Sequence, residues 1–543
     1  MRRTPRGSTQ RLPLPAPLSG AGIALTLALV LVLGRTEPLR AQVVPPQVGP
    51  PQVIELTLER MVELAMNNSF QIRTVELNIE RTQHNLRAEQ AGLKSRVDLN
   101  LQTPQFEQVS EFKYNSNLGR NEIVRENTQR WQADLSIKQP VILFGRPTNG
   151  ELSLNSRIYR YKQIEDDGAN DVRYYNRYFV AYKQNLFQPN DLKNNLEEAE
   201  LDLEDSELRY RNDVIGLIDE VSRDYLDLFE DAYDGTIYDR FVGRLEAVVV
   251  VAEGLAETDA ARAIEADQFR IELANAQQDQ QRAGSSFRLK AAEIKQGFQM
   301  PLTDSITLEP VMTVEPVAVD LDAAIAYART LTPRLRQLEM NFRENEINLE
   351  ETKGRQSFRM DVEVTYGREM QDPLLSDLFA EPTNSYTVRV GAYVPIWDWG
   401  RRNARIAASE INLKQTQLRI EQAEGDIASD VSNQVRNLEE FEGRALAMDD
   451  NLALASDGAD AALDRYRDGA IGALELLQSL DREVTTAENL LSAYVGWRRA
   501  IFRIQRLTFY DFQRGAPALE RFGIGMPRSF DGATIPPGVG GRR

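Results

Sequence analysis

The chain has 543 residues with a formal net charge of −18, no cysteine and a single histidine, His84. This composition excludes disulfides and thiolate metal sites, leaves little for histidine-based catalysis, and disfavours nucleic acid as a partner because phosphate binding needs a basic face. With 42% hydrophobic and 27% charged residues, the chain is neither a polytopic helical membrane protein nor a disordered one.

Residues 1–41 have the order of a secretory signal peptide. Several arginines come first, an apolar run over residues 21–33 follows, and Ala41 offers a small residue for cleavage. The run is too short to span a bilayer comfortably as a helix, and without a cysteine it cannot lead to lipoprotein acylation. The alternative is an uncleaved anchor. We therefore expect an exported protein with a proline-rich leader over residues 42–55.

The mature chain contains an internal repeat. Leu56–Ala65 aligns with Val319–Ala328, and Thr57 and Asp320 stand at positions typical of helix N-caps. Each half then has a proline-free stretch of over a hundred residues, which can be helical because proline breaks helices. The sequence therefore predicts a first repeat over residues 56–300, a linker over residues 301–318 and a second repeat over residues 319–512. A flexible tail is predicted over residues 513–543.

Helices make up most of both repeats. The apolar residues of one long stretch recur every three or four positions, as in a coiled-coil seam, at Val214, Ile218, Val221, Tyr225 and Leu228. The predicted helices cover residues 58–94, 190–256 and 264–298 in the first repeat and residues 321–355, 400–467 and 473–512 in the second. Two shorter helices together are about as long as one long helix, so stacked pairs beside long helices would form a tube wall.

Strands with alternating apolar and polar residues precede the long helices, at residues 97–187, 358–369 and 385–397. A soluble two-layer sheet has the same alternation. Charged residues such as Asp361 and Glu363 on the polar face favour a watery lumen, and aromatic residues near the strand ends, such as Trp399, are typical of membrane girdles. The pattern thus favours a membrane barrel.

Several motifs together resemble the TolC-like outer membrane efflux protein family, over about residues 54–512. These motifs are the paired openings, the strand-to-helix junctions and one helix turn, found in this chain at Leu56–Glu59, Val319–Asp322, Gln184–Phe187, Val394–Arg402 and Arg465–Gly469. The resemblance implies a mainly α protein with membrane β-strands: a homotrimer that shares one β-barrel, continued by a long coiled-coil periplasmic tunnel. Sharing fits the physics, because one copy has too few strands to close a barrel in lipid.

The resemblance also implies a function and its residues. It indicates a passive exit duct in the cell outer membrane, coupled to an inner-membrane transporter through a periplasmic adaptor, without enzyme activity, cofactor, metal or nucleic acid. The periplasmic gate would lie at Glu475 and Gln478, where glutamine departs from the family's second acidic residue. The adaptor would dock at turns containing Gly254 and Gly469. Drugs, metals, other small molecules and polypeptides all stay open as substrates.

The first repeat is longer than the second, and residues 131–161 predict one inserted hairpin. Two added strands preserve the up-and-down order, so a trimer with six strands per copy would have eighteen instead of the family's usual twelve. Alternatively, the hairpin projects as an extracellular extension, which is the favoured alternative.

Two rival functions stay open. The first is a periplasmic coiled-coil scaffold, or structural protein without a channel, whose strands form a soluble sheet. The second is an enzyme with an acidic active site, which the missing nucleophile motif disfavours. His84 lies between Gln83 and Asn85 on a predicted helix and is expected to be a surface residue.

Overall fold

The computed structural model describes residues 53–115, 119–164, 170–258 and 262–520. The predicted signal peptide, most of the predicted leader and residues 521–543 of the predicted tail lie outside the described residues. Two short pairings were not predicted. Strand β1 (Val53–Glu55) pairs in parallel with β6 (Ser305–Thr307), and β9 (Tyr510–Asp511) pairs with β10 (Ala516–Pro517). The first of these ties the leader to the linker between the repeats.

The start of the predicted tail is a correction. Ala518 and Leu519 are buried in a core cluster that also contains Met61 and Val214. The backbone N–H of Ala518 donates to the carbonyl of Phe509 at 2.9 Å. Gly, Pro and Arg indicate flexible chain, but two apolar side chains find a core to pack into, so the prediction is wrong for residues 513–520.

The first predicted helix is divided into α2 (Leu58–Asn68) and α3 (Phe70–Gly92). Ser69 between them has an extended backbone, and its hydroxyl accepts a hydrogen bond from the N–H of Ile72 at 3.4 Å. A serine that caps a new helix ends the preceding one, because the cap residue cannot have helical backbone angles. The predicted single helix over residues 58–94 is therefore wrong at this point.

The second repeat has the same break for a different reason. Its predicted helix over residues 321–355 is divided into α6 (Leu321–Leu331) and α7 (Pro333–Arg355). Thr332 between them has an extended backbone. Proline disfavours the helical conformation of the residue before it and suits the first position of a new helix. The break is encoded by the Thr332–Pro333 pair.

The long helices lie close to their predicted positions, as α4 (Asp191–Thr258), α5 (Ala263–Gly297), α8 (Arg401–Arg467) and α9 (Ala473–Thr508). Helix α9 ends four residues before its predicted end because Phe509 takes a left-handed conformation with φ 55°. At 1.5 Å per residue, α4 and α8 are each about 100 Å long.

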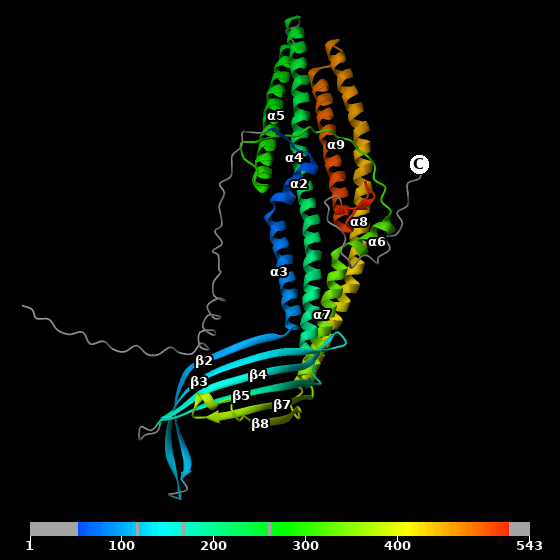
Figure 1. Cartoon of the computed structure of the whole chain (residues 1–543). Coiled ribbons are helices and arrows are strands. Elements are labelled where there is room, and N and C mark those ends of the chain that lie inside the picture. The colour runs from blue at the N-terminus through cyan, green and yellow to red at the C-terminus, as the bar shows by residue number, and fades with distance from the viewer. Residues whose placement is uncertain (1–52, 116–118, 165–169, 259–261, 521–543) are drawn as a thin grey trace, which may run out of the picture. The chain divides into compact units, whose positions relative to one another are not determined.

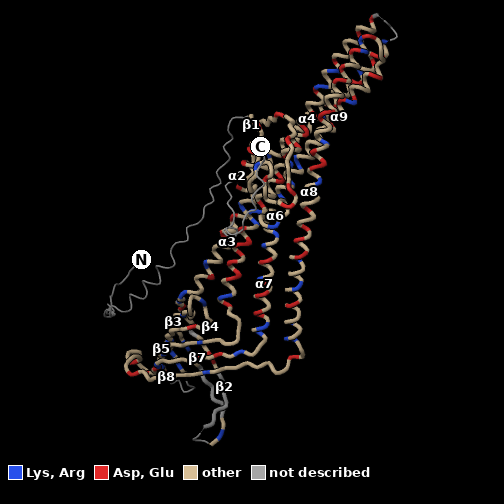
Figure 2. Tube along the Cα trace, turned by 90° about the vertical axis from the view of Figure 1, so that its right-hand side faces the viewer, with Lys and Arg blue, Asp and Glu red and all other residues tan. Residues whose placement is uncertain are grey.

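Shorter helices are stacked beside each long one, as predicted. Helix α3 lies along the part of α4 next to the sheet, and α5 lies along the part that extends away from it (Figure 1). Helices α7 and α9 accompany α8 in the same way (Figure 2). The two repeats are joined because α7 and α9 also contact α4. Near the sheet, the helices therefore form the row α3, α4, α7, α8.

One antiparallel sheet contains all the long strands in the order β2-β3-β4-β5-β7-β8. The strands are β2 (Arg96–Asn115), β3 (Arg120–Leu143), β4 (Arg146–Ile164), β5 (Asn170–Leu186), β7 (Arg359–Asp372) and β8 (Thr383–Tyr393). A 3₁₀ turn, η2 (Leu375–Asp377), lies in the β7–β8 connection. Among the described residues, β2 and β8 each have a strand on one side alone, so the sheet is open at both edges.

The inserted hairpin lies inside this sheet. Strand β3 pairs with β2 on one side and with β4 on the other, and β4 also pairs with β5. Residues 131–161 therefore do not project from the sheet, as the favoured extension would, because both sides of the hairpin satisfy their backbone groups within the sheet. The β2–β3 hairpin does continue past β4: it pairs as far as Asn115 with Arg120, whereas β4 stops opposite Asn127 (Figure 1).

Candidate functional site

One face of the sheet is apolar across all six strands. The strand register places six apolar side chains in a single line across the sheet, in the order Val97, Ile137, Leu154, Val180, Tyr366 and Tyr386. All six are 36–81% exposed in the single chain. A contiguous exposed apolar surface of this kind marks a contact with lipid or protein. Alternation of lipid-facing and lumen-facing residues is the pattern of membrane strands.

The opposite face of the sheet is polar and carries ion pairs between strands. Arg157 lies 2.6 Å from Asp134, and Arg389 lies 3.3 Å from Glu363. The carboxylate of Glu369 accepts a hydrogen bond from the hydroxyl of a neighbouring tyrosine at 2.8 Å. Cross-strand pairs of opposite charge stabilise a sheet modestly, and charged groups of both signs need water on this side.

Exposed aromatic side chains gather where the strands meet the helices. Phe144 follows β3, Phe187 follows β5, and Trp399 precedes α8; all three have positive φ angles, of 52°, 62° and 59°. Their exposed fractions are 104%, 65% and 89%. The rings of Trp397 and Trp399 meet edge to face at 5.5 Å. Exposed aromatic rings at strand ends suit a membrane–water interface, as predicted for the two tryptophans.

Gly469 lies in the turn between α8 and α9, with a φ of 73°. The N–H of Ala470 donates to the carbonyl of Arg465 at 2.8 Å, and the N–H of Gly469 donates to that of Tyr466 at 3.0 Å. These two bonds form the Schellman motif, which favours glycine at the left-handed position. The turn lies where the sequence predicted one, and its role in docking stays a prediction.

The turn predicted at Gly254 is a correction. Gly254 lies inside α4, which continues to Thr258, and space around it is open. A single glycine lowers helix stability by roughly 1 kcal/mol relative to alanine, which a 68-residue helix tolerates. The connection to α5 therefore begins beyond Thr258, more than one helical turn later.

The predicted gate residues lie at the start of α9. Glu475 belongs to its first turn, and Gln478 follows one turn later. Both side chains are exposed. A carboxylate in the first turn interacts favourably with the helix dipole. Within the part of the chain that the structure describes, Glu475 lies in no ion pair, and its role in a gate stays a prediction.

A cluster that the sequence did not predict joins the two helix turns. The buried hydroxyl of Tyr466 donates to Glu265 at 3.1 Å, and its ring packs edge to face on Phe269 at 5.3 Å. The guanidinium of Arg262 lies 5.8 Å from the same ring. Burial raises the pKa of Tyr466 to about 12, and the carboxylate of Glu265 adds to the rise. Tyr466 could be noticed in the turn motif, but its partners on α5 carry no sequence signal.

The middle of α4 carries an acidic stretch. Burial raises the pKa of Asp234 to about 6, and the carboxylates of Glu230 and Glu488 add to the rise. Arg499 of α9 pairs with Asp227 at 2.6 Å and with Glu230 at 3.4 Å. Arg499 therefore holds α4 to α9 through ion pairs, while the like charges around Asp234 oppose this contact.

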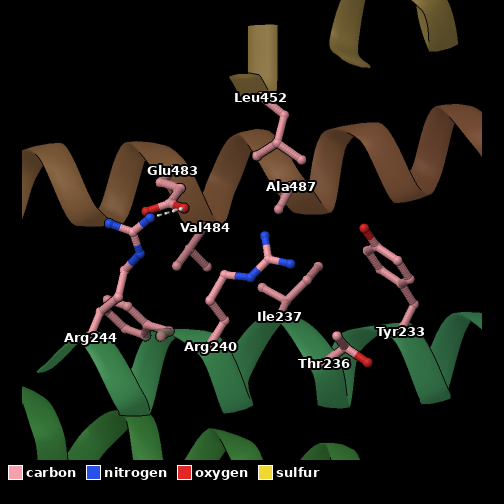
Figure 3. Close-up of a pocket in the computed structure, with 10 residues that line it drawn as sticks. Tyr233, Thr236, Ile237, Arg240, Arg244, Leu452, Glu483, Val484 and Ala487 are labelled. Atoms are coloured by element: carbon pink, nitrogen blue, oxygen red, sulfur yellow. Dashed lines mark ion pairs between the residues drawn. The ribbon is translucent and has the colours of Figure 1, made fainter. Parts of the chain in front are cut away.

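The cavity between α4, α8 and α9 is too small for a substrate. Arg244 of α4 points toward Glu483 of α9, and the two side chains lie 3.2 Å apart (Figure 3). The space among these residues, Leu452 and Ala487 is about 20 Å³, which is room for about one water molecule. This cavity belongs to the helix packing.

The remaining features considered in the sequence are the single histidine, possible metal ligands and membrane-spanning helices. His84 is exposed and lies 3.8 Å from Glu80 one turn earlier, which confirms that it is a surface residue. Among the described residues, no three acidic, histidine or cysteine side chains are grouped to hold a metal ion. No helix in the described ranges has the length and apolar character needed to cross a membrane.

Comparisons with known proteins agree with this geometry. Residues 343–508 match the family model described as outer membrane efflux protein. No curated protein matches the chain by sequence.

Solved structures with a similar fold include the channel-forming protein CusC, at 14% identity and a TM-score of 0.58, covering 88% of this chain and 99% of that one. VceC of Vibrio cholerae has 11% identity and a TM-score of 0.59, covering 84% and 96%. The open state of MtrE of Neisseria gonorrhoeae has 14% identity and a TM-score of 0.56, covering 83% and 88%. At these identities the likeness shows the fold.

The chain has the fold of the solved channel proteins CusC and MtrE, and the two-faced sheet fits that fold. The family match confirms the predicted resemblance to the TolC-like outer membrane efflux protein family. The predicted localisation in the cell outer membrane agrees with these matches.

Proposed function

We propose that this chain is the outer-membrane exit duct of a tripartite efflux or type I secretion system. It acts as a passive homotrimeric channel, coupled to an inner-membrane pump through a periplasmic adaptor. The observation that carries the proposal is the six-stranded sheet with two open edges, apolar on one face and charged on the other. In lipid, unpaired edge amides cost several kcal/mol each, so the sheet must be closed by other copies.

The outer helices of the row support closure by copies of the same chain. Helix α3 exposes Phe70 and Leu77, and α8 exposes Ile411 and Leu418. In both helices the two apolar residues are one heptad apart, which is the spacing of a coiled-coil seam. Helix α3 leads into the edge strand β2, and α8 follows the edge strand β8. A contact between α8 of one copy and α3 of the next would therefore also bring β8 of the first copy beside β2 of the next. Such head-to-tail contacts close into a ring when the rotation from one copy to the next is a whole fraction of a full turn.

The ends of the helices far from the sheet support the coupling to an adaptor. There, the α8–α9 turn at Gly469 and the connection after α4 are held together through Tyr466, Glu265 and Arg262. Packed turns at one end of a tube offer a defined docking surface. Energy for transport would come from the pump, because the tube itself only needs an open path.

The trimeric channel is tested with the full chain. Purification in detergent followed by light scattering should give a trimer, and planar bilayers should show ion conductance. A monomer that is soluble without detergent would instead support the periplasmic scaffold. A matched pair of variants sharpens the test: Val388→Lys puts a charge on the apolar face, and Thr387→Lys puts the same charge on the polar face.

The two variants should differ in membrane assembly. A lysine facing lipid near mid-bilayer costs about 2–4 kcal/mol, whereas a lysine in the lumen is tolerated. We expect Val388→Lys to lower the yield of trimer in outer membranes and Thr387→Lys to leave it unchanged. Equal yields for both would mean that the apolar face does not meet lipid.

The gate at Glu475 is tested by conductance. Three carboxylates around one axis would attract cations and repel one another by a few kcal/mol at about 4 Å and intermediate dielectric. We expect Glu475→Gln to lower the preference for cations, while Glu421→Gln, an equal change on the side of α8, leaves it unchanged. Unchanged selectivity in Glu475→Gln would remove the gate role. Gln478 contributes no charge to this ring.

A further inference from the structure

The turn of the β3–β4 hairpin is fixed at the junction of the sheet and the helices. The side-chain amide of Asn149 donates to the carbonyls of Gln188 and Pro189 at 2.9 and 3.0 Å, just before α4 begins. Gln139 donates to the carbonyl of Leu93 at 3.2 Å, just after α3 ends. The hairpin therefore starts at the same level as the strands that connect directly to helices, and it runs across the same part of the sheet.

The sequence of this turn repeats that of a strand-to-helix junction. Pro140, Phe144, Gly145 and Arg146 have the same spacing as Pro395, Trp399, Gly400 and Arg401. In both segments the aromatic residue and the glycine have positive φ angles, of 52° and 76° in the turn and 59° and 82° in the junction. The aromatic ring of the turn is fully exposed, like its counterpart. An aromatic anchor at this level places the hairpin's end at the membrane interface.

The widths of the sheet and of the helix row also agree. Six strands about 4.8 Å apart and tilted by about 35–45° cover roughly 35–40 Å of a barrel's circumference. Four helices packed about 8–10 Å apart cover roughly 32–40 Å. Four strands would cover only about 23–27 Å by the same arithmetic. Six strands per copy therefore cover about the same width as the helix row α3, α4, α7, α8, so the tube would not narrow where the barrel begins.

We propose that the barrel of this protein contains eighteen strands, six from each of three copies, with β2 of one copy paired to β8 of the next. The inference rests on the proposed function, because it takes the trimer as given. Strand β2 runs away from the helices and β8 runs back toward them, so the new pair is antiparallel like every other pair in the sheet. All edges are then closed.

The register of the new pair is proposed from the ends of the two edge strands. Arg96 and Tyr393 are the strand ends nearest the helices, so we place them opposite each other across the boundary between copies. Leu99 then lies opposite Val390, which keeps apolar side chains on the lipid face. A slip by one residue would move every side chain of the strand to the other face.

An eighteen-stranded barrel holds a water-filled channel. Its inner face carries charges of both signs, such as Asp134, Arg157 and Glu369. The exit therefore suits hydrophilic cargo of either charge, because the described side chains of the inner face carry both signs of charge.

Engineered cysteines test the edge pairing, and the chain offers a background without native cysteine. The pair Asn100→Cys with Arg389→Cys places two thiols opposite each other on the polar face across the copy boundary. Mild oxidation in outer membranes should give covalent dimers and trimers on non-reducing gels. The matched control, Asn100→Cys with Val390→Cys, puts the thiols on opposite faces and should stay monomeric.

A second set tests the number of strands. In one chain, Asp98→Cys with Ser136→Cys should form an intrachain disulfide, because Asp98 and Ser136 are partners in β2 and β3. Leu154→Cys on the lipid face should react with a charged, water-soluble maleimide at least about tenfold more slowly than Ser376→Cys in the exposed β7–β8 connection, because the reagent is excluded from hydrocarbon.

The outcomes distinguish the trimer itself from the number of strands in its barrel. Absence of cross-linked copies in any oxidised sample, together with a monomer in light scattering, would defeat the proposed trimer itself. Cross-linked trimers in which Leu154→Cys reacts as fast as Ser376→Cys, and in which Asp98→Cys with Ser136→Cys stays reduced, would keep the trimer. That result would overturn the eighteen-stranded barrel, since the hairpin would then stand outside the membrane.

Discussion

The two repeats have helices of nearly equal length but packing of unequal quality. Helices α2 and α6 have 11 residues each, α3 and α7 have 23 each, α4 and α8 have 68 and 67, and α5 and α9 have 35 and 36. Yet α9 has 16 buried residues and α5 has six. A tube wall requires equal lengths from both repeats, whereas burial depends on which neighbours each helix meets.

Helix α9 is better buried because it contacts both long helices. It packs along α8 over its length and also against α4, and residues of the linker such as Val314 and Val317 cover the same cluster. Helix α5 packs mainly on α4 and exposes Ile271 and Leu289. Helix α9 therefore holds the two repeats together within one chain, while α5 leaves an apolar surface that a second chain could cover.

The largest expected effect distinguishes these two helices. Trp497 of α9 is 1% exposed. The equivalent residue of the first repeat, by sequence alignment, is Phe287 of α5, which is only partly buried. Trp497→Ala should lower the stability of the protein by about 3–5 kcal/mol, because it leaves a large cavity. Phe287→Ala should cost clearly less. Thermal unfolding of both variants in detergent, followed by circular dichroism, measures the difference. Equal losses would show that trimer contacts bury α5 as deeply as α9.

The two glycines predicted for the turns should respond with opposite signs. Gly469→Ala should cost about 1–2 kcal/mol because alanine is strained at positive φ, and the new methyl would lie 3.1 Å from the Arg262 side chain. Gly254→Ala should stabilise the protein by about 0.5–1 kcal/mol, because its position is helical and open. Melting temperatures of the two variants should move in opposite directions. A lower melting temperature for Gly254→Ala would instead indicate that Gly254 lies in a turn.

A pH-dependent effect distinguishes the charges of the repeats. Asp234 of α4 corresponds by the repeat offset to Arg444 of α8, which pairs with Glu440 at 2.6 Å. The pKa of Asp234 is raised from 3.8 to about 6 in the folded protein. A raised carboxyl pKa means that the folded state binds the proton more tightly, so stability is gained as the pH falls from above 6 toward 4.

The test of this effect is a neutral substitution. Asp234→Asn should raise stability at pH 8 by about 1–2 kcal/mol, a value discounted because solvent screens a half-buried group. The gain should vanish near pH 4, where Asp234 is protonated as well. Melting temperatures over pH 4–8 measure it, and Glu246→Gln on the exposed side of α4 is the control. A gain that does not change with pH would assign the effect to packing.

The smallest expected effect compares the helix caps. Asp320 accepts a hydrogen bond from the N–H of Ala323 at 2.7 Å, and Thr57 accepts one from Arg60 at 3.2 Å. Asp320→Ala should cost about 1 kcal/mol and Thr57→Ala somewhat less, because the shorter bond to a carboxylate is stronger. Thermal unfolding at low salt measures both, with Asp322→Ala as the control. A larger loss from Asp322→Ala would point to the helix dipole and not the cap.

Much of the fold could be predicted because its pattern is local. The spacing from Val214 to Leu228 predicts a helical seam, and the alternation from Met360 to Val364 predicts a strand, since both follow from backbone periodicity. The breaks at Ser69 and Thr332 are equally local, yet they were missed because a continuing apolar pattern outweighs one cap residue. The gate residues could be named from the resemblance, but their distance from other copies is not a property of one chain.

The repeat, the helix lengths and the two faces of the strands could be predicted because each depends on residues close together in the chain, and the export signal stays an expectation. Three features needed the folded chain: the inserted hairpin lies inside the sheet, Leu519 is buried in a core cluster, and the hydroxyl of Tyr466 donates to Glu265. Those contacts join residues far apart in the chain, and their partners are selected by packing and by the need to pair every backbone group.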